Sequence, residues 1–350
     1  MTSTLTVVAV DPVADPRWRS LAVGPEASLF TSPPWIAAVC RTYGFAPQAR
    51  IAVRADGSPA GGVAWVSVDD ARGRRLLSLP FCDRADPLVP DRSTWDAVSA
   101  PLTTGAPPFT VRCLDGSPAV SDPRLRTVGE AAWHGTPLDS GLDELRQRIS
   151  GQARRNLATA ERAGVRVEIR DDLEAVRAMH RLHVRLRKQK YRLLAQPLEF
   201  FERIWKEFAP AGGCYTLLAS VGDEVVAGAL FLEWEGVLYY KFGASAREHL
   251  HVRPNDAIYW TAIRRGVERG LRLVDWGLSD LDQPGLVAFK RKWASVERSL
   301  LTLRAGEPAA GPAQRGLGDA LGELTRLLTD ESVPDEITER AGAVLYRYFC

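Results

Sequence analysis

Alternating apolar and polar residues mark three short stretches in each half of the chain, and this period of two predicts β-strands. Turn signals such as Asp56-Gly57 and Glu235-Gly236 separate the stretches. The predicted strands are Ala49–Val53, Ala60–Val68 and Arg74–Leu79 in the first half, and Cys214–Val221, Val225–Trp234 and Val237–Phe242 in the second. Because the same three-strand pattern occurs twice, we expect two related sheets.

Apolar residues spaced three or four apart predict helices in the second half. One apolar stripe runs from Leu142 to Ala160 and ends at Gly164, and the next runs from Leu173 to Leu186 after two aspartates. Between them, residues 165–169 alternate as a strand. The chain then predicts helix, strand, short helix and strand at 255–269, 272–276, 286–293 and 298–303, and closing helices at 317–328 and 337–348.

The composition is that of a globular protein with hydrophobic cores. The 350 residues are 45% hydrophobic and 25% charged with a net charge of +2, and this length suggests about two domains. The five cysteines are far apart without metal-binding spacing, and His180 and His183 have no third ligand nearby, so no metal site is expected. Unpaired cysteines suit a reducing cytoplasm, and no segment offers the ~20 apolar residues of a bilayer span, so we expect no integral membrane insertion. The apolar positions on the predicted helices are explained by two hydrophobic cores. They therefore give no information about the oligomeric state.

Three segments near the end of the second half carry the clearest motif. They are Tyr239–Ser245, Val274–Gly277 and Gly285–Trp293. In this order and spacing they resemble the carboxy-terminal half of the FemAB/FemX-type peptidyltransferases, a branch of the GNAT acyltransferases. The resemblance implies amide-bond formation by acyl transfer and an α/β (α+β) fold with two tandem GNAT-like domains, each a mixed, mostly antiparallel sheet flanked by helices.

The resemblance also sets expected domain limits. The first GNAT-like domain is expected at 1–140 and the second at 141–305. Residues 306–350 are expected to form a linker and C-terminal helices that pack back on the first domain, as in the family. The first half resembles the family more loosely, through Phe30–Trp35 and through Leu79–Asp83, where relatives carry an aspartate that faces the groove between domains.

Two residues are candidates for catalysis. Lys290 follows Phe289 in a pair that matches the family's active-site Phe-Lys, so the resemblance implies that it stabilises the charged intermediate. The alternative is a surface lysine in the cationic run 290–292. Asp83 is a candidate to orient or deprotonate the attacking amine, and the alternative is a turn aspartate.

The same motifs and the helix between them nominate residues that contact the substrates. Asp275 is also interpreted as structural, because a carboxylate at a strand end can bond neighbouring backbone amides. The substrate-binding candidates are Phe289, Tyr240, Lys241, Arg253, Asn255, Trp260 and Asp275.

The acyl donor is the open question. GNAT enzymes that use acyl-CoA cradle its pyrophosphate in a glycine-rich loop before the long helix, but residues 249–257 contain no glycine, and Asp256 is expected to repel a diphosphate. A basic stretch offers phosphate contacts instead, which suits aminoacyl-tRNA; the alternative is a solvated helix face. The cations expected to form this surface are Arg154, Arg155, Arg185, Lys188, Lys190 and Arg192.

These observations are compatible with three functions. The first is a cytoplasmic aminoacyltransferase that moves an amino acid from aminoacyl-tRNA to an amine of a peptidoglycan precursor, a nucleotide-linked acceptor or a peptide-like natural product, with no bound cofactor. The second is an N-acyltransferase that uses acyl-CoA or an acyl carrier protein. The third is a non-enzymatic nucleic-acid or partner-binding protein on an acyltransferase frame.

Overall fold

The computed structural model describes residues 5–70, 73–307 and 311–350. Its contacts divide the chain into two compact units: Met1–Ala132 with Arg298–Leu321 and Cys350, and Trp133–Glu297 with Gly322–Phe349. These limits differ from the expected division at 140 and 305. Arg298–Leu321 groups with the first unit and Gly322–Phe349 with the second. The packing of the C-terminal helices on the first domain stays a prediction. Residues 308–310 of the expected linker lie outside the described residues.

The first unit is built on a mostly antiparallel sheet. Its strands follow the order β1-β2-β3-β4-β5-β12, and β4 and β5 run parallel while the other consecutive pairs are antiparallel. The strands are β1 Thr6–Val10, β2 Pro47–Val53, β3 Pro59–Asp70, β4 Gly73–Leu77, β5 Phe109–Leu114 and β12 Val296–Ala305, and the helices are α1 Pro16–Leu21, α2 Pro33–Tyr43 and α3 Arg92–Thr103.

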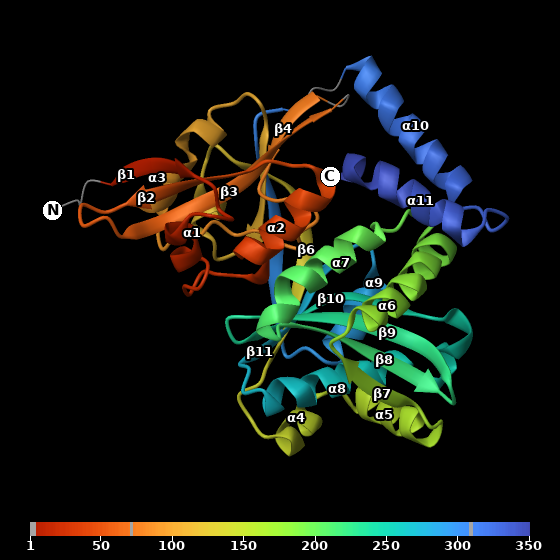
Figure 1. Cartoon of the computed structure of the whole chain (residues 1–350). Coiled ribbons are helices and arrows are strands. Elements are labelled where there is room, and N and C mark those ends of the chain that lie inside the picture. The colour runs from red at the N-terminus through yellow and green to blue at the C-terminus, as the bar shows by residue number, and fades with distance from the viewer. Residues whose placement is uncertain (1–4, 71–72, 308–310) are drawn as a thin grey trace. The chain divides into compact units, whose positions relative to one another are not determined.

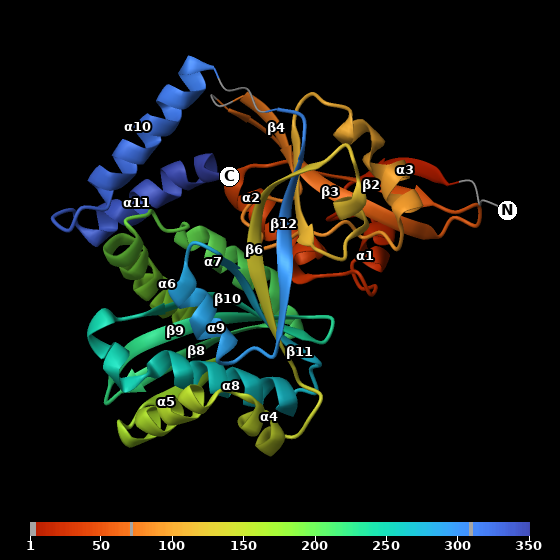
Figure 2. The same cartoon turned by 180° about the vertical axis from the view of Figure 1, so that it is seen from behind.

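The second unit repeats this plan, as Figures 1 and 2 show. The strand order is β11-β10-β9-β8-β7, and β10 and β11 form the parallel pair. The strands are β7 Arg166–Arg170, β8 Cys214–Val221, β9 Glu224–Trp234, β10 Val237–Ser245 and β11 Leu273–Asp280, joined by β6 Arg126–Pro137, in which the chain enters this unit. In each unit four antiparallel strands lead through a helix to a parallel fifth strand, so the predicted duplication is confirmed.

Helices cover both faces of the second sheet (Figure 1). These are α4 Leu142–Arg148, α5 Gly151–Arg162, α6 Leu173–Leu186, the π-helix Arg187–Tyr191, α7 Leu198–Phe208, α8 Pro254–Glu268 and α9 Pro284–Arg291. On one face, α4, α5 and α8 pack with the apolar side chains of one strand register, among them Leu217 and Ala229. On the other face lie α6 and α7, where Gly228 lets the backbone of β9 approach Met179.

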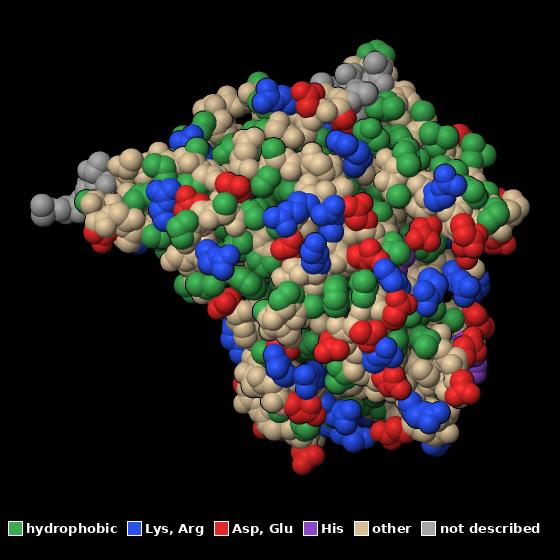
Figure 3. Space-filling model, in the orientation of Figure 1, with side chains coloured by type: hydrophobic (Ala, Val, Ile, Leu, Met, Phe, Trp, Pro, Cys, Tyr) green, Lys and Arg blue, Asp and Glu red, His purple; other side chains and the backbone are tan. Residues whose placement is uncertain are grey.

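Two terminal helices complete the chain, α10 Pro312–Leu328 and α11 Asp335–Leu345. Both were expected from their periodicity. The stripe expected as one helix from Leu142 to Ala160 is instead divided into α4 and α5, because Ile149 is extended and Ser150 caps α5 by accepting a hydrogen bond from Ala153 N. The helix α7 was not among the predicted helices. Charges on the face seen in Figure 3 are interspersed, as the small net charge suggests.

Candidate functional site

A pocket opens in the second unit where the parallel strands separate. β10 and β11 pair through Tyr239 and Asp275 and no further, although β10 continues to Ser245 and β11 to Asp280. A β-bulge follows at once in β10, between Tyr240 and Phe242. Beside this divergence lies a pocket of about 1030 Å³, bounded by β10, the start of α8, α9, the end of α6 and the π-helix.

One side of the pocket is held by aromatic packing. The ring of Tyr259 stacks on Trp276 at 4.2 Å between centroids and meets Tyr240 at 5.1 Å and Phe289 at 5.0 Å. The hydroxyls of Tyr240 and Tyr259 are hydrogen-bonded, and burial raises the pKa of Tyr240 to about 12. A Cβ at residue 243 would overlap the Tyr240 hydroxyl, so Gly243 is needed for this ring to fit. We call this the packed side.

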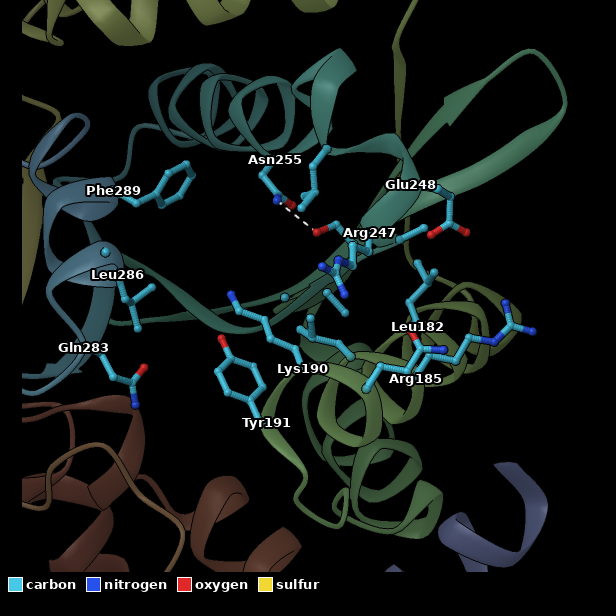
Figure 4. A pocket seen from close by; sticks show the side chains of 18 of the residues that line it. Leu182, Arg185, Lys190, Tyr191, Arg247, Glu248, Asn255, Gln283, Leu286 and Phe289 are labelled. Carbon is cyan, nitrogen blue, oxygen red and sulfur yellow. Dashed lines mark hydrogen bonds between the residues drawn. The ribbon is translucent and has the colours of Figure 1, made fainter. Parts of the chain in front are cut away.

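The other side is cationic. Lys190 and Tyr191 project from the π-helix into the space between α9 and the start of α8 (Figure 4), and the Lys190 ammonium lies 5.0 Å from the Tyr191 ring centroid. Arg185 and Arg247 also line the pocket, and Glu248 adds one carboxylate. Arg247 is exposed and forms no ion pair with any residue that the structure describes. This charged side suits a ligand with phosphate groups.

Five of the residues nominated from the sequence line this pocket. They come from five separate elements and are Tyr240, Asn255, Phe289, Arg185 and Lys190. Asn255 lies in the first turn of α8, and its Nδ2 donates to the Ser245 hydroxyl at 3.1 Å, which joins the end of β10 to the start of the helix (Figure 4).

Other substrate-binding candidates lie outside the lining. Lys241 is the bulge residue of β10, with its ammonium 5.3 Å from the Phe242 ring centroid. Arg253 is exposed and adopts a left-handed φ of 61° before α8. Trp260 is half-buried beside the core, with the Arg146 guanidinium 5.9 Å from its ring centroid. Asp275 is buried and accepts a hydrogen bond from Gly277 N at 2.7 Å, which is the expected kind of structural contact. It lies within β11 rather than at the strand end, because the strand continues to Asp280.

Lys290 is buried in α9, with only 4% of its surface exposed, so the alternative of a surface lysine is wrong. Its ammonium donates to the carbonyl of Leu278 on β11 at 2.6 Å. Lys290 is not among the residues that line the pocket, although its neighbour Phe289 is. Burial and the nearby Lys290 charge lower the pKa of the buried His134 to about 4, so this imidazole is neutral at pH 7. The catalytic role of Lys290 stays a prediction.

Asp83 belongs to the first unit, in the loop 78–86 that follows β4. The loop contains two non-glycine residues with left-handed backbone, Leu79 at φ 69° and Phe81 at φ 61°. Packing holds this backbone: the Phe81 ring lies 4.4 Å from Tyr43, and Trp35 Nε1 donates to Cys82 Sγ at 3.0 Å. Asp83 is half-buried, and its role toward the amine stays a prediction.

The six expected phosphate-binding cations do not share one surface. Arg154 and Arg155 lie on α5. The other four lie on the opposite face of the sheet, at the end of α6 and in or directly after the π-helix (Figures 1 and 2). Arg154 donates to the carbonyls of Gln147 and Ile149 at 2.8 and 2.6 Å, where α4 ends. Only Arg185 and Lys190 reach the pocket.

Asp256 does not oppose a ligand as expected. Its carboxylate is buried beneath the start of α8 and accepts a hydrogen bond from Asn156 Nδ2 at 3.1 Å. Burial raises the pKa of this carboxyl. The pocket is therefore lined by Asn255 rather than by its acidic neighbour.

Sequence reasoning did not nominate Arg247, Tyr259 or Gln283, which also line the pocket. Arg247 stands two residues after Ser245, the end of the Tyr239–Ser245 motif, so its place after a strand end was an available signal. Within the described ranges, no cluster of three or more His, Cys, Asp or Glu side chains could hold a metal ion. In the same ranges, no helix combines the length and apolar character needed to cross a membrane.

Comparisons with known proteins support the fold described above. Residues 145–291 match the family described as Acetyltransferase (GNAT) domain. The fold is similar to the crystal structure of FemX, with a TM-score of 0.66 and 16% identity over 81% of this chain and 94% of that one. L-PGS from Bacillus licheniformis (TM-score 0.51, 16% identity, 85% and 93% covered) and a tandem GNAT protein from the clavulanic acid biosynthesis pathway (0.51, 16%, 87% and 99%) are similar too. No curated protein matches the sequence.

Proposed function

We propose that this chain, a FemAB-like acyltransferase of the GNAT superfamily, transfers an aminoacyl group from aminoacyl-tRNA to an amine and so forms an amide bond. The acceptor is an amine of a peptidoglycan precursor or of a peptide-like natural product. The observation that supports this best is the pocket at the divergence of β10 and β11, with aromatic rings on one side and Arg185, Lys190 and Arg247 on the other.

The reaction makes a few demands on the site. A neutral amine attacks the ester carbonyl, the new C–N bond forms, the ester C–O bond breaks, and the amine proton is transferred to the departing ribose oxygen. Negative charge develops on the carbonyl oxygen, and the buried ammonium of Lys290 is the proposed source of stabilisation. Asp83 is the proposed group that orients the amine.

The donor's terminal nucleotide carries an aromatic base and phosphates, and both find counterparts here. Tyr191 is exposed and offers a ring on which a base can stack, while Lys190 and Arg247 can neutralise phosphates. Tyr240, Asn255 and Phe289 are the proposed contacts of the aminoacyl end, with Lys241, Arg253, Trp260 and Asp275 proposed at the margins of the site. Glycine is missing from 249–257, so the usual pyrophosphate cradle of acyl-CoA enzymes is missing too.

An acyl-CoA or carrier-protein donor is the second candidate, and one observation favours it. The carboxylate of Asp256 is buried against Asn156, so its charge does not face the pocket at the start of α8. The N–H groups at this helix start therefore remain compatible with a phosphate.

A binding experiment separates the two donors. The purified protein is titrated with a bulk aminoacyl-tRNA pool and, separately, with acetyl-CoA, each across a salt series. We expect micromolar tRNA binding that weakens steeply with salt, and a K190Q/R247Q variant should lower the slope of log K against log salt by roughly 1–2, because two phosphate contacts are lost.

The control variant is R162Q/R264Q, which removes two exposed arginines outside the pocket lining. It should leave the slope nearly unchanged. Binding of acetyl-CoA without tRNA binding would overturn the proposed donor and support the second candidate.

A further inference from the structure

The π-helix that carries Lys190 and Tyr191 is fastened on its other side to the C-terminal segment 329–342. Both segments belong to the second unit. A π-helix is rare and occurs mostly as a single turn within a longer helix, frequently at functional sites. Here it continues α6 directly, and Arg192 ends it with a left-handed φ of 52°. The contacts that stabilise this short element decide where two pocket residues point.

Lys188 is the centre of this attachment. Only 4% of its surface is exposed, and its ammonium donates to the carbonyl of Val333 and to Asp335 Oδ1, the latter at 2.9 Å. Lys190, two residues later, is exposed and lines the pocket. The π-helix therefore directs one lysine into the protein and the other into the pocket. A buried ammonium with a paired carboxylate is costly to separate, which makes the contact a strong fastening.

Further contacts join the C-terminal segment to residues just before and just after the π-helix. Arg192 donates to the carbonyl of Thr329 at 2.8 Å and pairs with Glu331 at 3.1 Å, and the pocket residue Arg185 lies 3.5 Å from Asp335 Oδ2. Gly342 of α11 lies so close to the Ala195 carbonyl that a Cβ there would overlap it. Asp335 thus contacts two cations, one buried beneath the π-helix and one at the pocket.

We propose that Lys188 and Asp335 are positioning residues of the donor site, and that segment 329–342 acts as a latch that holds the π-helix in its pocket-forming position. The identity of the donor rests on the proposed function; the latch itself rests on the contacts above. The contacts of the latch hold Lys190 at its position opposite the packed side of the pocket. They therefore govern donor affinity and leave the chemical step unchanged.

The test uses D335N, which keeps the shape of the side chain and removes its charge. Hydrogen exchange of amides 187–193 should become ~10-fold faster, and affinity for the donor probe, aminoacyl-tRNA or acetyl-CoA, should fall ~10-fold, since one charged hydrogen-bond partner is weakened. Turnover at saturating donor should stay the same. K188M removes the other partner and should give the same pattern, while D335E should restore most of the affinity.

The matched control is E336Q. Glu336 is exposed in the same first turn of α11, so this variant loses the same favourable charge at the helix start without touching Lys188. E336Q should leave both readouts near wild type. Unchanged exchange at 187–193 in D335N would overturn the latch, and faster exchange with unchanged donor affinity would overturn its positioning role. Binding of neither probe by the wild type would overturn the proposed donor, and the exchange rates would still decide for or against the latch.

Discussion

Both units have a parallel strand pair at the same point of their topology. The two pairs differ in which groups hydrogen-bond the backbone N–H and C=O groups where the paired strands separate. In the first unit, β4 and β5 pair through Leu76 and Leu77, and the loop after β4 keeps bonding to β5. Ser78 N donates to the Thr110 carbonyl at 2.9 Å, Ala85 N to the Arg112 carbonyl at 2.8 Å, and Asp86 accepts from Leu114 N at 2.9 Å. The loop after β4 supplies all three of these partners to β5, two from its backbone and one from the Asp86 side chain.

In the second unit, β10 and β11 separate after Tyr239 and Asp275, and side chains do part of this work. The carboxylate of Asp275 accepts from Gly277 N, and the ammonium of Lys290 bonds to the Leu278 carbonyl. Residues 246–253 lead from the end of β10 into α8, rather than back along β11. The end of β10 therefore borders the pocket, which Tyr240 and residues 243–245 line.

The difference shows how one frame serves two purposes. A strand edge has unpaired N–H and C=O groups that must find partners. Where a loop supplies the partners, the repeat gains stability; where side chains supply some of them, space remains for a ligand. The comparison predicts that changes near β5 act on stability, and that changes near β11 act on activity.

The largest expected effect is at Lys290, beside the open divergence. The variant K290M removes the ammonium and should lower turnover ~100-fold, the size of one lost contact to a developing oxyanion. Steady-state kinetics with the donor that binds in the salt series would measure it. Donor affinity should stay close to wild type, because Lys290 does not line the pocket.

Since Lys290 is buried, its variants need a check of folding by circular dichroism. K290R keeps a cation and a donor for the Leu278 carbonyl, and should retain more turnover than K290M. If folded K290M turns over as fast as wild type, Lys290 only supports β11. The prediction that changes near β11 act on activity would then be wrong at this residue.

A smaller effect is expected at Asp86, in the loop that bonds to β5 where β4 and β5 separate. Asp86 is nearly buried, accepts from Leu114 N and pairs with Arg84 at 2.5 Å. D86A leaves that N–H without its acceptor and should cost about 2 kcal/mol of unfolding free energy, measured by urea denaturation.

D86N offers a matched comparison, because the amide oxygen can still accept from Leu114 N. It should be less destabilising than D86A. Neither variant should change donor affinity. A clear loss of donor affinity in folded D86N would contradict this comparison. In the comparison, the separating strands β4 and β5 serve stability and the separating strands β10 and β11 serve ligand binding.

Much of the fold could be predicted from the sequence, since it depends on local patterns. The limits of β8 coincide with the predicted Cys214–Val221, and β9 starts one residue earlier than predicted, because alternation and turn residues are short-range signals. The helix α7 was missed although Phe200, Phe201, Ile204 and Phe208 follow a helical spacing and are buried. The break between α4 and α5 depends on the Ser150 cap, which the apolar stripe alone does not reveal.

The site was less predictable, because it depends on contacts between distant residues. Lys188 and Lys190 look alike in a basic run, yet the bonds to Val333 and Asp335 bury the first and leave the second in the pocket. The divergence of β10 and β11 is likewise a tertiary feature. Motif resemblance found Phe289 and Tyr240, and the helix between the motifs supplied Asn255, but neither signal could rank the cations around them.

The smallest expected effect concerns Asp256, a carboxyl that is buried and hydrogen-bonded to the uncharged side chain of Asn156. Burial raises the pKa of Asp256 above its ordinary value of 3.8, so folding favours the protonated form, and the ionised form costs stability. This cost is absent at pH below the ordinary value and grows as pH rises through the folded-state pKa.

The variant D256N tests this cost. D256N does not titrate, and its amide oxygen can still accept from Asn156 Nδ2. The stability of D256N relative to wild type should therefore increase from pH 4 to pH 7, as followed by thermal unfolding in a pH series. D335N, by contrast, should be less stable than wild type, because the Asp335 carboxylate pairs with Lys188 and the variant loses this favourable contact. A stability difference between D256N and wild type that is flat with pH, or that falls, would mean that α8 is held by the Asp256 charge and not only by packing.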